Sequence, residues 1–320
     1  MTAMFGFLKS LFSRRVEPAL PPPRFTTVDL ARRLGVDAAE LARVDVSYKA
    51  FQVPKRSGGM RTIQAPAPPL MAVQRLILRR LLRRLRAHPN ATGFERGHSI
   101  VTNALPHVDK DIVIRLDLVN FFPSISADRV ERYFRFIGYD QEAATILTRL
   151  CTYKGSLPQG APTSPRLSNL VNYRLDARLA ALAESRGLSY SRYADDITFS
   201  ARIADLAATR CANPKALERQ KRRQPRPNDL IHAAKAVIAS EGYRLHMHRK
   251  LRVSRRHDRQ LVTGLVVNSK PDLPRATRRR LRAVADHLRR GRPATLTPQQ
   301  LAGWHALQAM IAAQRATPAS

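Results

Sequence analysis

The sequence has few acidic residues: 24 Asp and Glu stand against 56 Lys and Arg in 320 residues, so the formal net charge is +32. Such a charge costs self-repulsion in the compact state unless a polyanion neutralises it. Of the 56 basic residues 46 are Arg, whose guanidinium groups match phosphate oxygens better than ammonium groups do. The shortage of acids therefore points to a nucleic acid as partner, with a GC-rich coding bias as the alternative source of the arginines.

Cysteines and long apolar runs are also scarce. The two cysteines, Cys151 and Cys211, can form neither a disulfide framework nor a four-ligand zinc site, and they fit a reducing compartment. No apolar run reaches about 18 residues, so we expect no membrane-spanning helix. The first segment, MTAMFGFLKSLFSRR, places its apolar stretch before its positive charges, the reverse of a secretory signal. These absences predict a cytoplasmic protein with no membrane partner.

The hydrophobic pattern predicts a folded chain with both helices and strands. Hydrophobic residues make up 44% of the sequence, which excludes disorder throughout. Alternating stretches predict a hairpin with a basic tip over 48–66, a buried strand over 111–118 and a strand pair over 188–201. Helical spacing predicts several amphipathic helices, among them one over 164–187 with Pro165 in its first turn. Mixed elements without a repeat indicate the α+β class.

Three carboxylates stand out in this acid-poor chain. Asp117 is near the end of an apolar strand, and Asp195 and Asp196 lie in the turn between two others. Alternation sends Asp195 and Asp196 to opposite faces, so at most one of them points directly into a site shared with Asp117. Close carboxylates repel unless a cation lies between them, and Mg²⁺ takes oxygen ligands. The pattern fits a two-ion phosphoryl-transfer site, and a merely polar turn is the alternative.

The neighbours of these carboxylates resemble the ordered motifs of a reverse transcriptase. The strings are IRLDLVNFFPSI over 114–125, LPQGAPTSPRLSNL over 157–170 and RYADDITFS over 192–200. Within that family the chain is most similar to the retron reverse transcriptases of bacteria. This second likeness rests on GFERGHSIVTNALPH over 93–107 and on VTG over 262–264.

The resemblance implies an α+β right-hand polymerase with fingers, a palm of antiparallel sheet and helices, and a helical thumb. It places an N-terminal extension at 1–24 and N-terminal helices with fingers at 25–110. The palm would span 111–268, with interleaved fingers segments, and the thumb 269–320. A basic insertion at about 210–229 departs from the pattern of the family.

The resemblance also implies a role for each matching residue of the catalytic centre. Asp117 and Asp195 correspond to the main ligands of two Mg²⁺ ions, and Asp196 to a third, weaker one. Phe122 follows Asp117 by five residues, where the family places a bulky side chain that excludes a ribose 2′-OH. The other residues expected to bind the nucleotide are Lys55, Arg61, Gln159 and Gly160.

A further set is expected to bind nucleic acid: Asn103, His107, Thr263, Gly264, Arg278, Arg279 and Arg282. The three arginines can share one surface of a basic helix, which suits a duplex backbone. A structural histidine is as good an interpretation of His107 as an RNA contact is. His246 and His248 alternate on a predicted strand, and we do not expect them to bind metal.

By this resemblance the activity is RNA-directed DNA polymerisation from deoxynucleoside triphosphates. The template would be part of a structured non-coding RNA, primed from a guanosine 2′-OH, and the product a branched RNA–DNA hybrid (msDNA). Anti-phage defence with an effector protein is implied as well. The alternatives are a group II intron-like or phage-exclusion reverse transcriptase, and a non-catalytic RNA-binding scaffold.

Overall fold

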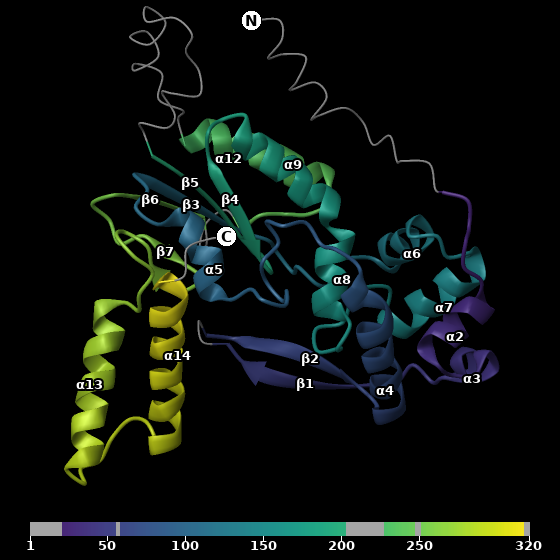
Figure 1. Cartoon of the computed structure of the whole chain (residues 1–320), viewed down its shortest axis with the longest axis horizontal. Coiled ribbons are helices and arrows are strands. Elements are labelled where there is room, and N and C mark those ends of the chain that lie inside the picture. Colours follow the sequence, from purple (N-terminus) through teal and green to yellow (C-terminus); the bar gives the residue numbers. More distant parts are fainter. Residues whose placement is uncertain (1–20, 56–57, 203–226, 247–250, 317–320) are drawn as a thin grey trace, which may run out of the picture. The chain divides into compact units, whose positions relative to one another are not determined.

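The computed structural model describes residues 21–55, 58–202, 227–246 and 251–316. These residues form helices and antiparallel strands, so the α+β class is confirmed (Figure 1). The chain divides into two compact units, each assembled from three stretches. The first unit consists of Met1–Phe94, Leu118–Arg178 and Lys235–Arg244, and the second of Glu95–Asp117, Leu179–Ala234 and Leu245–Ser320. Most of the predicted N-terminal extension and most of the predicted insertion lie outside the described residues.

Where the structure describes it, the first unit is mainly helical and contains one hairpin. Strands β1 (Tyr48–Pro54) and β2 (Met60–Pro66) pair antiparallel in the register Val53↔Arg61, which confirms the predicted hairpin. The helical elements of this unit begin with α2 (Thr27–Leu34), α3 (Ala38–Arg43), α4 (Pro68–Leu76), a π-helix η1 (Ile77–Leu81) and a 3₁₀ turn η2 (Leu82–Arg84). They continue with α6 (Ala127–Phe136), α7 (Gln141–Cys151), α8 (Ser164–Val171) and α9 (Tyr173–Glu184). The division between the units falls within α9 and within α12 (Pro227–Ser240).

The helix predicted over 164–187 is two helices, α8 and α9, separated at Asn172. The Asn172 side chain is fully buried, and its amide nitrogen donates to the Ser168 carbonyl oxygen at 2.8 Å. Its amide oxygen accepts from Arg129 Nη2 at 3.1 Å and from the Tyr243 hydroxyl at 2.7 Å. These partners from distant parts of the sequence hold the break, which no local pattern could have predicted.

The second unit is built around a four-stranded antiparallel sheet in the order β4-β5-β3-β6. Its strands are β3 (Ile112–Asp117), β4 (Ser189–Tyr193), β5 (Asp196–Ala201) and β6 (Arg252–Arg255). β3 pairs with β5 from Ile112↔Ala201 to Asp117↔Asp196, and its other edge pairs with β6. β3 is a central strand, with β5 at one edge and β6 at the other. Four of its six residues are apolar, and most of the strand is buried, as expected for a strand in the core of the unit.

Short elements and two long helices complete the second unit. They are α5 (Ile100–Ala104), η3 (Leu105–His107), β7 (Leu261–Val262), β8 (Leu265–Val266), α13 (Arg275–Arg289) and α14 (Pro298–Ala316). α13 and α14 lie side by side (Figure 1), and Leu281, Val284 and Ile311 on them belong to one buried cluster with Val113 and Val262. In the part of the chain that the structure describes, no helix is long and apolar enough to cross a membrane.

Candidate functional site

The hairpin β4–β5 holds two of the three predicted carboxylates at its turn. Tyr193 pairs with Asp196, so that Ala194 and Asp195 form a two-residue loop. Ala194 adopts a left-handed backbone (φ 57°), as tight hairpin turns require. The fully buried Arg192 donates from Nη1 to the Ala194 carbonyl oxygen at 3.0 Å. A guanidinium fixed in the core therefore holds the loop that carries Asp195.

Asp117 and Asp196 lie directly opposite each other on neighbouring strands. Side chains at directly opposed positions of an antiparallel pair lie on the same face of the sheet. Asp117 is only 5% exposed, whereas Asp196 and Asp195 are half-buried. The register thus brings Asp196 to the face of Asp117, with Asp195 one position away in the turn. The assignment of Asp195 as a main metal ligand stays a prediction.

Two cationic or ionisable groups lie beside these carboxylates: Arg115, which the sequence analysis did not single out, and His246, whose position next to Asp117 it did not predict. Arg115 Nη2 lies 3.4 Å from an Asp196 carboxylate oxygen, and His246 Nε2 lies 3.6 Å from Asp117 Oδ1. The His246 backbone N–H also donates to the Asp117 carbonyl oxygen at 2.9 Å. The sequence could have indicated the position of Arg115. It precedes Asp117 by two residues on one strand, so the two side chains share a face of the sheet. His248 lies outside the described residues.

The chemistry of this carboxylate pair suits magnesium. Within the described ranges, no group of three His, Cys, Asp or Glu side chains is close enough to hold a metal ion. Mg²⁺ does not require such a cage, because it commonly takes one or two carboxylates and completes its shell with waters and substrate phosphates. Asp117 and Asp196 supply oxygen donors on a single face, so this donor set fits Mg²⁺.

The predicted nucleotide-binding residues all belong to the first unit. The loop before α8 packs on strand β2, since the Gln64 backbone N–H donates to the Gln159 carbonyl oxygen at 2.8 Å. Gly160 has φ 135°, and a Cβ added to it would lie 2.7 Å from the Gln64 carbonyl oxygen. Lys55 and Arg61 are exposed on the same hairpin. The structure therefore brings the loop and the hairpin together.

Phe122 belongs to an aromatic group within the first unit. Its ring lies 5.4 Å from that of Phe121 and 6.1 Å from that of Phe94, centroid to centroid. The side chain is half-buried and Phe94 is 44% exposed, so part of this group faces solvent.

The segment of Asn103 and His107 contacts the turn of Thr263 and Gly264 within the second unit. Thr263 Oγ1 donates to the carbonyl oxygen of Ile100, the first residue of α5, at 2.9 Å. Both residues of the β7–β8 turn have positive φ, 47° at Thr263 and 84° at Gly264. A β-branched residue rarely adopts this backbone, and the hydrogen bond to α5 offsets its cost. Asn103 is buried, whereas Gly264 is exposed.

His107 is fully buried in the second unit. Its Nδ1 lies 2.7 Å from Ser200 Oγ and its Nε2 2.8 Å from Ser191 Oγ, so that one ring nitrogen donates and the other accepts. Burial lowers the pKa of His107 from 6.5 to about 3. Of the two interpretations that the sequence left open, this position favours the structural histidine, which joins η3 to β4 and β5.

The neutral His107 predicts a loss of stability in acid. Since the pKa of its imidazole is lower in the folded chain than in the unfolded one, the unfolded chain binds more protons below pH 6.5. The free energy of unfolding should therefore fall as the pH drops from 6.5 towards 3, by at most about 1.4 kcal/mol per pH unit from this group. Urea unfolding of the chain and of His107→Gln at several pH values measures it.

The variant should show a shallower pH dependence than the unchanged chain over that range. His305→Gln, which removes an exposed histidine on α14, is the control and should keep the full slope. An equal slope in all three proteins would contradict a neutral, buried His107.

The three predicted arginines of the basic helix lie on α13 and are exposed. Arg278 Nη1 lies 3.1 Å from Asp272 Oδ2, so its charge is partly compensated. Arg279 and Arg282 follow on the exposed side, whereas Leu281 and Val284 are buried. The helix thus presents guanidinium groups to solvent and its apolar residues to the core.

Comparison with known proteins gives one consistent result. Residues 53–222 match the family described as reverse transcriptase (RNA-dependent DNA polymerase). The chain is 38% identical over 296 residues to the retron Mx162 reverse transcriptase of Myxococcus xanthus, covering 82% of this chain and 59% of that protein. It is 34% identical over 279 residues to the retron Ec86 reverse transcriptase of Escherichia coli, covering 86% and 80%. It is 38% identical over 285 residues to the retron Mx65 reverse transcriptase of Myxococcus xanthus, covering 81% and 62%. The chain thus spans about three fifths of the two Myxococcus relatives.

Proposed function

Because this chain belongs to the retron reverse transcriptases, a group of RNA-directed DNA polymerases, we propose that it copies part of a structured non-coding RNA into DNA. The proposed product is a branched RNA–DNA hybrid (msDNA), and the proposed cellular role is anti-phage defence with an effector protein. One observation carries the proposal: Asp117 and Asp196 are paired on neighbouring strands, with Asp195 in the adjoining turn. A scaffold that only bound RNA would have no need of this arrangement.

The carboxylates would hold two Mg²⁺ ions, mainly through Asp117 and Asp195 and more weakly through Asp196. When bound, such ions activate the attacking primer hydroxyl and stabilise the charge that develops on the α-phosphate and the leaving oxygen. The buried Arg192 keeps the turn of Asp195 in position. Arg115 limits the repulsion between the carboxylates by its contact with Asp196.

The first unit would bind the incoming deoxynucleoside triphosphate. Lys55 and Arg61 are exposed cations on the hairpin, suited to the triphosphate. The backbone of Gln159 and Gly160 would contact the nucleotide, because the loop is fixed against β2. Phe122 would exclude a ribose 2′-OH by its size. In the fingers, palm and thumb arrangement, we assign the hairpin to the fingers, the four-stranded sheet to the palm, and α13 and α14 to the thumb.

The second unit would hold the RNA and its hybrid with DNA. The turn of Thr263 and the exposed Gly264 would form one contact with the RNA. A second, phosphate-binding surface on α13 would consist of Arg278, Arg279 and Arg282. The buried Asn103 and His107 would support this turn through α5 and η3 rather than contact RNA themselves.

DNA synthesis on the RNA encoded beside the gene tests the proposal. The full chain, this RNA, deoxynucleoside triphosphates and Mg²⁺ should yield labelled DNA that remains joined to RNA under denaturing conditions. RNase treatment should remove RNA from the labelled product, so that the product migrates faster in a denaturing gel. No labelled DNA should migrate as it did before the treatment. DNA that separates from the RNA would indicate a reverse transcriptase of another kind. RNA binding without any incorporation would indicate a non-catalytic scaffold.

A further inference from the structure

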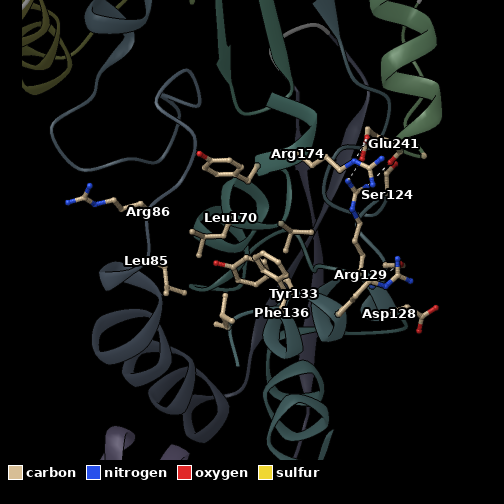
Figure 2. Close-up of a pocket in the computed structure, with 16 residues that line it drawn as sticks. Leu85, Arg86, Ser124, Asp128, Arg129, Tyr133, Phe136, Leu170, Arg174 and Glu241 are labelled. Atoms are coloured by element: carbon tan, nitrogen blue, oxygen red, sulfur yellow. Dashed lines mark hydrogen bonds and ion pairs between the residues drawn. The ribbon is translucent and has the colours of Figure 1, made fainter. Parts of the chain in front are cut away.

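A cavity of about 760 Å³ opens on the first unit, and none of the residues assigned above to metal, nucleotide or RNA lines it. It lies between α6, the end of α8, the start of α9 and the residues that follow η2 and α12. Tyr133 and Phe136 of α6 lie next to each other at its centre, with Leu85 and Leu170 close by (Figure 2). The floor of this groove is therefore aromatic and aliphatic.

Two aromatic side chains of the groove remain accessible to solvent. Phe136 is 51% and Tyr173 is 49% exposed, which is unusual for side chains of this size. The Tyr173 ring is fixed edge-on by His88, with the ring centroids 5.2 Å apart. Exposed apolar rings in a concave site mark a surface that binds a ligand.

The groove carries more positive than negative side chains, since four arginines but only two acids, Asp128 and Glu241, line it. Asp128 is exposed, whereas Glu241 is already neutralised. Glu241 has a side chain only 9% exposed and lies within ion-pair distance of three guanidinium groups. These belong to Arg129 at 3.7 Å, Arg174 at 3.4 Å and Arg178 at 2.6 Å, and Figure 2 shows the contacts of the first two. One carboxylate is thus shared by three cations.

Further arginines line or adjoin the same groove. Arg86 and Arg132 line it, and Arg86 extends outward from the chain at the rim (Figure 2). Among the described residues no carboxylate forms an ion pair with Arg86. Arg83 and Arg84, just before it, are also exposed. Guanidinium groups around exposed aromatic rings are the features with which proteins bind single-stranded nucleic acid.

We propose that this groove binds unpaired nucleotides of the RNA partner, in addition to the polymerase residues. Bases would stack on Phe136 and Tyr173, and phosphates would contact Arg86 and Arg132. Paired bases present no free face to the rings, so the groove would select unpaired segments over duplex. The proposal rests on the proposed function only for the choice of RNA as the natural ligand.

Fluorescence anisotropy with a labelled oligouridylate of about 12 nucleotides tests the groove. Saturating blunt RNA–DNA hybrid is present throughout, because it occupies the polymerase residues and offers no unpaired base. Phe136→Ala should weaken binding about tenfold, since it removes one stacking platform. Phe136→Tyr keeps a ring and should bind as the unchanged chain does. Arg86→Glu should also weaken binding, most strongly at low salt.

Arg43→Glu is the matched control for the charge reversal. Arg43 is exposed on α3 in the same unit and does not line the groove, so its variant should lose much less affinity. Unchanged binding by Phe136→Ala, or an equal loss of affinity in Arg86→Glu and Arg43→Glu, would overturn the proposal. A labelled RNA duplex of the same length is measured in the same way, and an equal loss of affinity for it and for the oligouridylate in Phe136→Ala would also overturn the proposal.

Primer extension on a simple primed RNA template separates this inference from the proposed function. If the chain extends the primer but the groove variants bind RNA normally, the groove inference fails and the function stands. If the chain makes no DNA but its RNA affinity depends on Phe136, the function fails and the groove stands.

Discussion

Asp195→Asn should reduce DNA synthesis by on the order of 10³-fold and leave RNA affinity unchanged. The substitution keeps the size of the side chain and its place in the turn, but it removes the charge that would hold a metal ion. Because the arginines proposed to bind RNA lie elsewhere in the chain, we expect RNA affinity not to depend on this carboxylate. Primer extension measures the first quantity and filter binding the second.

Two further variants make this test specific. Asp258→Asn removes the same charge from an exposed turn after β6 and should retain synthesis. Asp196→Asn compares the two neighbouring carboxylates, because the family resemblance assigns the main role to Asp195 while the register sets Asp196 opposite Asp117. A larger loss in Asp196→Asn than in Asp195→Asn would reverse these two roles. Undiminished synthesis in both would contradict the site.

Gly160→Ala should lower kcat/KM for the deoxynucleotide by about 10²-fold, the scale of an ångström-sized displacement in an active site. A Cβ at this position would lie 2.7 Å from the Gln64 carbonyl oxygen, and the backbone angle of 135° disfavours any side chain. The loop must then move away from β2, which breaks its hydrogen bond with Gln64. Steady-state incorporation with varied nucleotide concentration measures the effect.

Gly155→Ala is the matched control for this substitution. Gly155 also has a positive φ, 77°, but an added Cβ would meet no atom within 4 Å. It should therefore share the backbone strain without the collision, and retain most of the activity. Equal losses in the two variants would mean that backbone strain, not the contact with β2, determines the effect.

Local patterns predicted the parts of the fold in which sequence neighbours interact. The hairpin of β1 and β2, the buried strand β3 and the hairpin of β4 and β5 were all identifiable from alternation and turn residues. The break at Asn172 was not, because its partners Arg129 and Tyr243 are distant in the sequence. For the same reason no pattern revealed that His107 is held by Ser191 and Ser200.

The sequence indicated which residues belong to the candidate site, but not how they are arranged in space. Spacing and resemblance identified the three carboxylates, whereas the pairing of Asp117 with Asp196 depends on the register of two strands far apart in the sequence. The proximity of His246 to Asp117 follows from the return of the chain after α12. The aromatic residues of the groove carried no motif, since each belongs to an ordinary amphipathic helix.

The interleaving of the two units has a consequence for how the chain folds during synthesis. β3 acquires its first neighbour only when residues 196–201 have been made, and its second when residues 252–255 follow. Until then the backbone N–H and C=O groups along its edges are unpaired and open to incorrect pairing, which is a typical cause of aggregation in proteins dominated by non-local contacts. Slow translation or a chaperone would therefore matter most between the emergence of β3 and that of β6.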